Sequence, residues 1–192
     1  MSGSYHTVVA DPPWHYESWP SGSTSANSRY YAADAIQRRK AIPYPTMSVE
    51  EIAALPVTDL AADDAHLYLW TTNRYLFDAR AVAEAWGFKY AQLLVWAKTP
   101  MGKGPGGTFA QSAEYILFCR RGSLRSLKRL DTVWWNWRRT GRHSAKPEAM
   151  IDMVEQVSPG PRVELFARRA RFGWDYWGDE SLGTADMSER AA

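Results

Sequence analysis

At 192 residues the chain is long enough for one well-packed domain and too short for two ordinary ones. Hydrophobic residues make up 45% and charged residues 23%, and no apolar stretch approaches the ~20 residues that a membrane helix needs, so we expect a soluble protein. The single cysteine, Cys119, excludes an internal disulfide and a cysteine-built metal site, which favours the cytoplasm. The net charge of +2 conceals a basic segment, residues 120–171, with 13 Lys/Arg against 5 Asp/Glu, and this predicts an anionic partner.

The first predicted element is a short buried strand over residues 5–10, with the β-branched sequence YHTVVA. The motif DPPW at 11–14 must end it, because proline cannot donate to a strand ladder. Residues 15–45 show no periodicity, which is typical of a functional loop. A capping box, S-x-x-E at 48–51, begins a helix predicted over residues 48–55.

The rest of the chain alternates predicted strands with predicted helices. One helix ends at Gly87 in the C-cap position, and a later one carries Pro147 in its first turn. This alternation predicts an α/β fold with a mostly parallel sheet and helices on both faces. Strands are expected at 66–71, 89–98, 114–119, 132–135, 162–167 and 173–178, and helices at 73–87 and 146–157.

Two motifs follow strand ends and are expected to open onto one crevice. In an open sheet, ligands bind beyond the carboxyl ends of the strands, at a topological switch point. DPPW follows the strand at 5–10, and ARRAR (167–171) follows the strand at 162–167. The predicted elements continue up to residue 178. The sequence thus predicts one domain over residues 1–180, followed by a flexible tail at 181–192.

The DPPW motif suits a planar base that carries an exocyclic amine. Accepting hydrogen bonds from both N–H groups localises the amine lone pair, and Asp11 with the carbonyl of Pro12 or Pro13 would supply two acceptors held in advance. Trp14 would supply a flat wall for an extruded base. The structural alternative is a polar strand end with a Pro-Pro turn and a tryptophan packed beneath it.

Five motifs together resemble one known family. They are DPPW at 11–14, YPTM at 44–47, LYLWTTN at 67–73, HSAKPE at 143–148 and SPGPRVELFARR at 158–169. In this order they resemble the MT-A70-type family of adenine-N6 methyltransferases, over roughly residues 5 to 180. The resemblance implies a Rossmann-like class I methyltransferase fold with permuted motif order, and S-adenosylmethionine as the methyl donor.

The resemblance also implies roles for individual residues. Asp11 would hold the cofactor's ammonium group or the target amine, and Pro12, Pro13 and Trp14 would line the base pocket. Tyr44 would belong to a loop that closes over the site, and Trp70 and Asn73 would border the cleft. The cofactor would contact Lys146, Glu164, Phe166, Arg168 and Asp179, the last of which takes the place of a more usual asparagine.

Two departures from the family pattern affect the cofactor site. Only MSGSY precedes the first strand, where family members usually carry an acidic stretch that contacts the cofactor's adenine; that contact is missing or supplied elsewhere. The turn after VELF reads ARR rather than a glycine-rich GxG.

The basic segment fits a nucleic-acid substrate. Arg138, Arg139 and Arg142 flank motifs that ring the predicted cleft, where phosphate contacts would give affinity without sequence information. The tryptophans at 134, 135 and 137 are typical of core or interface packing rather than of a stacking platform.

These observations predict S-adenosylmethionine-dependent methylation of adenine N6 in nucleic acid, with DNA ahead of RNA and without a metal. Two alternatives remain open: a non-catalytic nucleic-acid-binding partner subunit of a methyltransferase complex, and a cytosine-N4 methyltransferase. A homodimer or a partner subunit is compatible with either.

Overall fold

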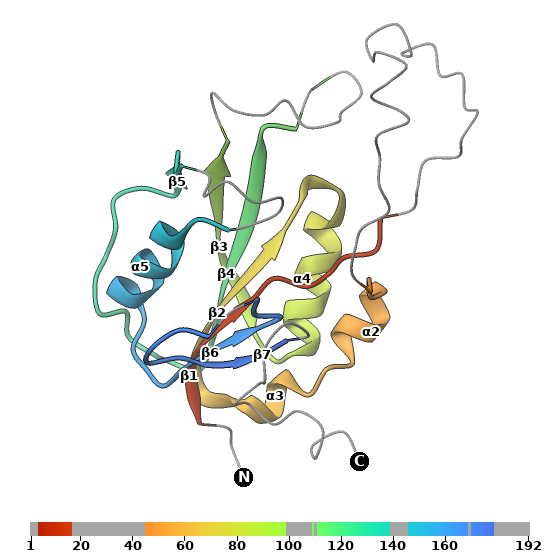
Figure 1. Ribbon diagram of the computed structural model, residues 1–192. Helices are drawn as coiled ribbons and strands as arrows, with labels where there is room; N and C mark the ends of the chain where they lie inside the picture. The colour runs from red at the N-terminus through yellow and green to blue at the C-terminus, as the bar shows by residue number, and fades with distance from the viewer. Residues whose placement is uncertain are drawn as a thin grey trace, which may run out of the picture.

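The computed structural model describes residues 4–16, 45–98, 109, 111–138, 146–168 and 170–178 (Figure 1). The tail predicted at 181–192 and most of the loop predicted at 15–45 lie outside these ranges, so those expectations stay predictions.

One seven-stranded sheet forms the centre of the fold, with the order β5-β3-β4-β2-β1-β6-β7. Every pairing is parallel except the two made by β4, so the predicted mostly parallel sheet is confirmed. The strands are β1 (Tyr5–Ala10), β2 (Ala61–Thr71), β3 (Lys89–Ala97), β4 (Ala113–Arg121), β5 (Trp134–Trp135), β6 (Arg162–Leu165) and β7 (Asp175–Trp177).

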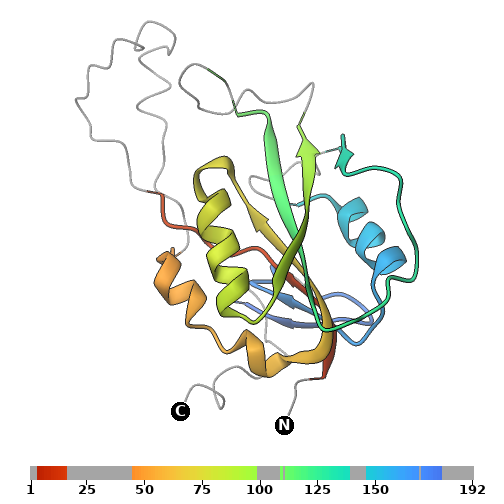
Figure 2. The ribbon, with the colours of Figure 1, turned by 180° about the vertical axis from the view of Figure 1, so that it is seen from behind.

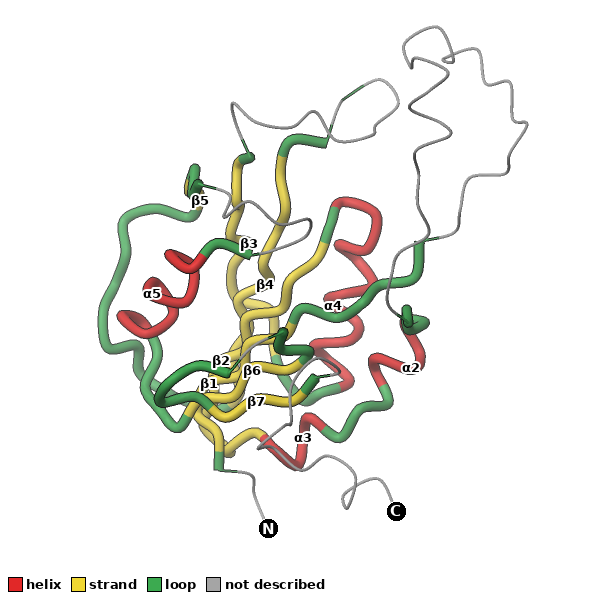
Figure 3. Tube along the Cα trace, in the orientation of Figure 1, coloured by secondary structure: helices red, strands yellow, loops and turns green. Residues whose placement is uncertain are grey.

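Helices cover both faces of this sheet, as predicted. Figures 1 and 2 show α5 (Glu148–Val157) on one face, and α2 (Val49–Ala53), α3 (Val57–Leu60) and α4 (Leu76–Ala85) on the other. A 3-10 turn, η2 (Asn73–Tyr75), links β2 to α4. The tube in Figure 3 shows the strands passing between these two helical layers.

Each face of the sheet has its own hydrophobic core. Alternate residues of a strand point to opposite faces, so Val8 and Ala10 of β1 pack under α4 while Val9 packs under α5. The free thiol of Cys119 is buried in the first core, and burial raises its pKa to about 12. A buried thiol with a raised pKa is typical of a structural cysteine and not of a nucleophile.

Local sequence signals explain most element ends. The capping box is present: Ser48 Oγ accepts from the Glu51 N–H at 3.2 Å, and Glu51 accepts from the Ser48 N–H at 2.7 Å. Gly87 adopts a φ of +81° directly after α4, a conformation that glycine reaches without strain.

Two local predictions need correction. Pro147 is the N-cap of α5 and not a first-turn residue, so Lys146 precedes the helix and does not open it. Helix α3 has no counterpart among the predicted elements, because four residues are too few to show a helical period.

Strand β1 is the topological switch point of the sheet. The chain continues from β1 to β2 on one side, while β6 pairs with β1 on the other. The loop after β1 therefore leaves the sheet between two diverging connections, which is where open α/β sheets bind ligands.

Candidate active site

A cleft of about 570 Å³ opens at the carboxyl ends of the parallel strands. DPPW from the end of β1 and Arg168 from the loop after β6 both line it, so the prediction that these motifs share one crevice is confirmed. Its volume lies in the range of small-molecule sites. The lining residues are Asp11, Pro12, Pro13, Trp14, Tyr16, Pro45, Met47, Thr71, Thr72, Glu114, Lys146, Phe166, Ala167, Arg168, Trp177 and Gly178.

Charged side chains form a connected group on one wall of the cleft. Lys146 Nζ lies 2.8 Å from Asp11 Oδ1 and 3.2 Å from Glu114 Oε2. Lys98, which follows β3, pairs with the other carboxylate oxygen of Glu114. The ammonium of Lys146 also lies 4.8 Å above the ring of Trp70. Two acids and two cations thus alternate along this wall.

The pairing controls the protonation of these groups. Burial works against the charged form of Lys146, but Asp11 and Glu114 outweigh it and raise the pKa of Lys146 above its ordinary value. Burial likewise works against an ionised Glu114, but Lys146 and Lys98 outweigh it and lower the pKa of Glu114. Near neutral pH, Lys146 is therefore a cation and Glu114 an anion.

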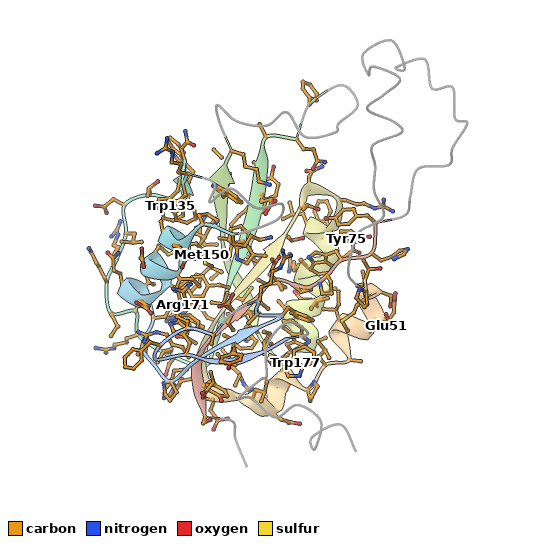
Figure 4. All side chains as sticks on the ribbon, viewed as in Figure 1. Glu51, Tyr75, Trp135, Met150, Arg171 and Trp177 are labelled. Carbon is orange, nitrogen blue, oxygen red and sulfur yellow. The ribbon has the colours of Figure 1, made fainter. Side chains whose placement is uncertain are left out.

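Trp14 is held more tightly than a free stacking wall would be. Trp14 is 5% exposed and stacks on Tyr75, the residue labelled in Figure 4, with centroids 5.2 Å apart and planes at 16°. Its Nε1–H donates to the carbonyl of Trp70 at 3.1 Å. Tyr16 packs edge-on against Tyr75 and shares a 2.7 Å hydrogen bond with Thr72. Trp14 thus combines the two alternatives, because it is packed like a structural tryptophan and still lines the cleft.

The carbonyls of both prolines already accept one backbone hydrogen bond. Pro12 accepts from the Trp14 N–H and Pro13 from the Met47 N–H, each at 2.9 Å. These bonds fix the direction of the two carbonyls, and an amide oxygen has two lone pairs. A second bond to an incoming amine is therefore compatible with the structure.

The turn after β6 reaches an unusual backbone conformation without a glycine. Phe166 has a φ of +62°, in the left-handed region that costs a non-glycine residue about 1–3 kcal/mol. The next residue, Ala167, donates its N–H to the carbonyl of Trp177 at 3.0 Å. A Cβ at Gly178 would lie 2.4 Å from the Ala167 carbonyl oxygen, so glycine at 178 permits this contact. The ARR turn contains no glycine. Gly178, which follows β7, supplies the residue without a side chain that the close contact with this turn requires.

Glu164 lies one residue back from the cleft edge, half-buried on the α5 face of β6. Burial raises the pKa of Glu164, Asp11 adds to this rise, and Arg171 opposes it. The neighbouring Arg171 pairs at 2.5 Å with Glu148 in the first turn of α5. Glu164 does not itself line the cleft.

Several other predicted residues do not line the cleft. The Trp70 side chain is 2% exposed and lies beneath Lys146, so it supports the cleft wall from below, and its predicted contact with substrate stays a prediction. Asn73 and Arg138 are both exposed, Asn73 next to the cleft residue Thr72. Tyr44, Arg139, Arg142 and Asp179 lie outside the described residues.

The sequence reasoning missed Glu114, Tyr16 and Tyr75. Glu114 is near the start of β4, and only the antiparallel direction of that strand brings its first residues to the cleft edge. An acid at the start of an apolar strand was the available signal, but strand direction is set by tertiary pairing. The tyrosines gave no signal by periodicity or spacing.

Comparison with known proteins gives the family. The MT-A70 family profile matches residues 5–180. The chain belongs to the MT-A70 family. This is a family of methyltransferases, so the resemblance drawn from the five motifs and the Rossmann-like methyltransferase fold are both confirmed.

Named MT-A70 relatives differ in how much of their length this chain spans. The type II methyltransferase M.MunI of a Mycoplasma species is 30% identical over 187 residues, covering 92% of this chain and 77% of the relative. A putative N(6)-adenosine-methyltransferase of Medicago truncatula is 30% identical over 97% of this chain and 28% of its own length. The human N(6)-adenosine-methyltransferase catalytic subunit METTL3 is 27% identical over 86% of this chain and 26% of its own length. The chain thus spans about a quarter of these eukaryotic relatives.

Two structural findings concern metals and membranes. Within the described ranges, no three His, Cys, Asp or Glu side chains gather so as to hold a metal ion, and a metal-free reaction stays a prediction for this MT-A70 chain. In the same part of the chain, no helix has the length and apolar character needed to cross a membrane.

Proposed function

We propose that this chain transfers a methyl group from S-adenosylmethionine to the exocyclic N6 amine of adenine in nucleic acid, with DNA preferred to RNA. The observation that carries the proposal is the position of Asp11. Its Oδ1 is held by Lys146 at 2.8 Å in a cleft at the switch point of the sheet, and Oδ2 has no partner within the described part of the chain.

Asp11 and the prolines would activate the amine. An adenine amine is a poor nucleophile because its lone pair is delocalised into the ring. Oδ2 of Asp11 and the second lone pair of the Pro12 carbonyl would accept its two N–H groups and favour a tetrahedral nitrogen. The Lys146 contact and the backbone bond to Pro12 fix these acceptors in advance, so little reorganisation is needed during reaction. Asp11 can also accept the proton that the methylated amine must lose.

The residues present fit the cofactor. When bound, S-adenosylmethionine supplies a methyl group on a positively charged sulfur, which an amine lone pair can attack in line. Phe166, Arg168 and Trp177 would hold it beside the backbone of Ala167 and Gly178, which lie so close together that a side chain on residue 178 would displace this turn. Glu164 and Asp179 remain proposed acceptors for its polar groups.

The proposed preference for DNA rests on the share of each relative's length that aligns with this chain. The chain aligns with 77% of the Mycoplasma type II methyltransferase, but with only about a quarter of relatives whose names specify adenosine. The basic balance of residues 120–171 suits either polynucleotide.

The test uses labelled S-adenosylmethionine with single-stranded and duplex DNA and RNA, followed by nucleoside digestion and mass analysis. We expect N6-methyladenine, mainly in DNA. Asp11→Ala and Asp11→Asn should each lower the rate at least about 100-fold. Arg80→Ala, which breaks an exposed ion pair on α4, should not lower it.

Three outcomes would contradict the proposal. N4-methylcytosine as the product would favour the cytosine alternative. Near-normal transfer by Asp11→Ala would exclude the mechanism. Absence of binding heat with S-adenosylmethionine in calorimetry, together with retained oligonucleotide binding, would favour a non-catalytic subunit.

A further inference from the structure

The segment around β5 divides its side chains between two faces. Trp135, which Figure 4 labels, stacks on Trp137 with centroids 4.9 Å apart and planes at 11°, and both pack against the core under α5. Trp96 Nε1–H donates to the Trp137 carbonyl at 2.9 Å and anchors the segment. Trp134 is 60% exposed, and Arg138 is also exposed. Because neighbouring strand residues point to opposite faces, Trp134 projects away from the α5 core that Trp135 contacts, and Arg138 lies three residues beyond the end of β5.

The backbone that carries Trp134 is fixed by the sheet. Trp134 pairs with Val95 of β3, and the Val95 N–H donates to the Val133 carbonyl at 2.8 Å. Thr132 Oγ1 accepts from the Trp134 N–H at 3.2 Å and donates to the Trp134 carbonyl at 2.9 Å. The N–H and carbonyl of Trp134 are thus both bonded to Thr132, and they are not left for pairing with a strand of another protein.

Strand β5 pairs with the last residues of β3, at the end of that strand that leads to the cleft wall. Strand β5 runs parallel to β3, at the outer side of β3 in Figures 1 and 2. Lys98 follows the end of β3 and pairs with Glu114 in the cleft wall. Trp134 therefore lies beside the end of β3 from which Lys98 reaches the cleft wall.

The chain segment that ends in Trp134 and Arg138 is basic in sequence. Residues 120–138 contain six Lys/Arg and one Asp. A single exposed tryptophan needs no explanation by itself. An indole on a fixed strand, with a cation four residues on and basic chain around it, matches the combination used to bind single strands: a ring that stacks on bases and charges that contact phosphates.

We propose that Trp134 and Arg138 form a binding strip for the single-stranded part of the nucleic-acid substrate, beside the cleft. Trp134 stacks on a base that flanks the target adenine, and Arg138 contacts a phosphate. Bases inside a duplex are already stacked, so the strip favours single strands or opened duplexes. This inference rests on the proposed function and adds the strandedness of its substrate.

The test measures binding of fluorescently labelled oligonucleotides by anisotropy, together with KM and kcat for methylation. We expect Trp134→Ala to weaken single-strand binding about 5- to 150-fold, to raise KM, and to leave kcat nearly unchanged. Trp134→Phe, which keeps an aromatic ring, should retain most of the affinity. Arg138→Ala should weaken the binding of every oligonucleotide sequence equally. It should also reduce the slope of log affinity against log salt concentration by about one.

An abasic scan identifies the stacked base. One abasic position near the target adenine should weaken binding by the wild type and have no further effect on Trp134→Ala. The matched control is Phe172→Ala, a fully exposed aromatic at the turn before β7, on the opposite edge of the sheet. Equal affinities for Trp134→Ala and Phe172→Ala would overturn the inference.

A protein partner gives a different result. If Trp134→Ala changes the oligomeric state in light scattering and leaves oligonucleotide affinity unchanged, the strip is a protein interface and the inference is wrong. Failure of the proposed function is separable: it would appear as loss of nucleic-acid methylation in the wild type itself, or as normal transfer by Asp11→Ala.

Discussion

Lys146 Nζ lies 2.8 Å from Asp11 Oδ1, although one residue follows the first strand and the other precedes the last helix. The same ammonium lies 3.2 Å from Glu114, so one cation separates two carboxylates in the cleft. This arrangement holds Asp11 in place and keeps two like charges from destabilising each other. The following predictions test it and the parts of the fold that support it.

Removal of the Lys146 ammonium should lower the rate of methyl transfer. Lys146→Met keeps the apolar stem but leaves Asp11 and Glu114 facing each other without a cation. We expect kcat to fall about 100-fold, because Asp11 loses its fixed position. The pKa of Glu114 should rise, which would move the acidic limb of the rate profile to higher pH. Steady-state rates across pH measure both effects, and an unchanged kcat and profile would show that Lys146 is only a packing residue.

Glu114 is predicted to act as a positioning residue through Lys146. Glu114→Gln removes the charge that Lys98 and Lys146 share, and this should lower the pKa of Lys146. We expect kcat to fall about tenfold or more, with a smaller change in KM. Asp63→Asn is the matched control, because its ion pair with Arg121 is long, at 4.0 Å, and Asp63 is 80% exposed. Equal rates for the two variants would refute the positioning role.

Gly178 should be required for cofactor binding. A methyl group at Gly178→Ala would lie 2.4 Å from the Ala167 carbonyl oxygen, so the turn that lines the cleft must shift. We expect at least about tenfold weaker binding of S-adenosylmethionine in calorimetry. Gly173→Ala is the control: its φ of +77° makes alanine strained, but nothing lies within 4 Å of the added Cβ. That variant should lose about 1 kcal/mol of stability and keep its cofactor affinity.

Buried His66 should make stability depend on pH. Its Nε2–H donates to the Leu124 carbonyl at 3.3 Å, so Nδ1 accepts from the Ser158 hydroxyl at 2.7 Å, and Ser158 in turn accepts from Tyr68. The pKa of His66 falls from 6.5 to about 4, mainly because the ring is buried; the hydrogen bond to Leu124 opposes this shift and the charge of Arg120 adds to it. A second proton would displace Ser158 and break this chain of hydrogen bonds.

The unfolded chain therefore binds this proton first as the pH falls from about 6.5 to about 4. The free energy of unfolding should decrease over that window, by up to about 3 kcal/mol from this group. Urea titrations at several pH values measure it. His66→Gln should lose this part of the pH dependence, whereas His15→Gln at an exposed position should keep it. Equal pH dependence in the wild type and His66→Gln would contradict the prediction.

Much of the architecture follows from local sequence. The β-branched run before Asp11 forms a buried strand because it suits a pleated, enclosed surface, and Pro12 ends that strand because it lacks an N–H. Ser48 and Glu51 cap a helix by bonds within four residues, and Gly87 permits the backbone that follows α4. Such interactions act within one turn of the chain, so their pattern is visible in the sequence.

By itself, the sequence determined the strand that ends in Asp11, the mostly parallel sheet and the family, because these depend on local pattern and motif order. Only the tertiary structure decided which side chains meet. The antiparallel direction of β4 brings Glu114 to Lys146, and the stacking of Trp14 on Tyr75 encloses a ring that the motif alone presents as free. The position of Trp70 beneath Lys146 is likewise a tertiary feature, because it depends on distant strands and not on the neighbours of Trp70 in sequence.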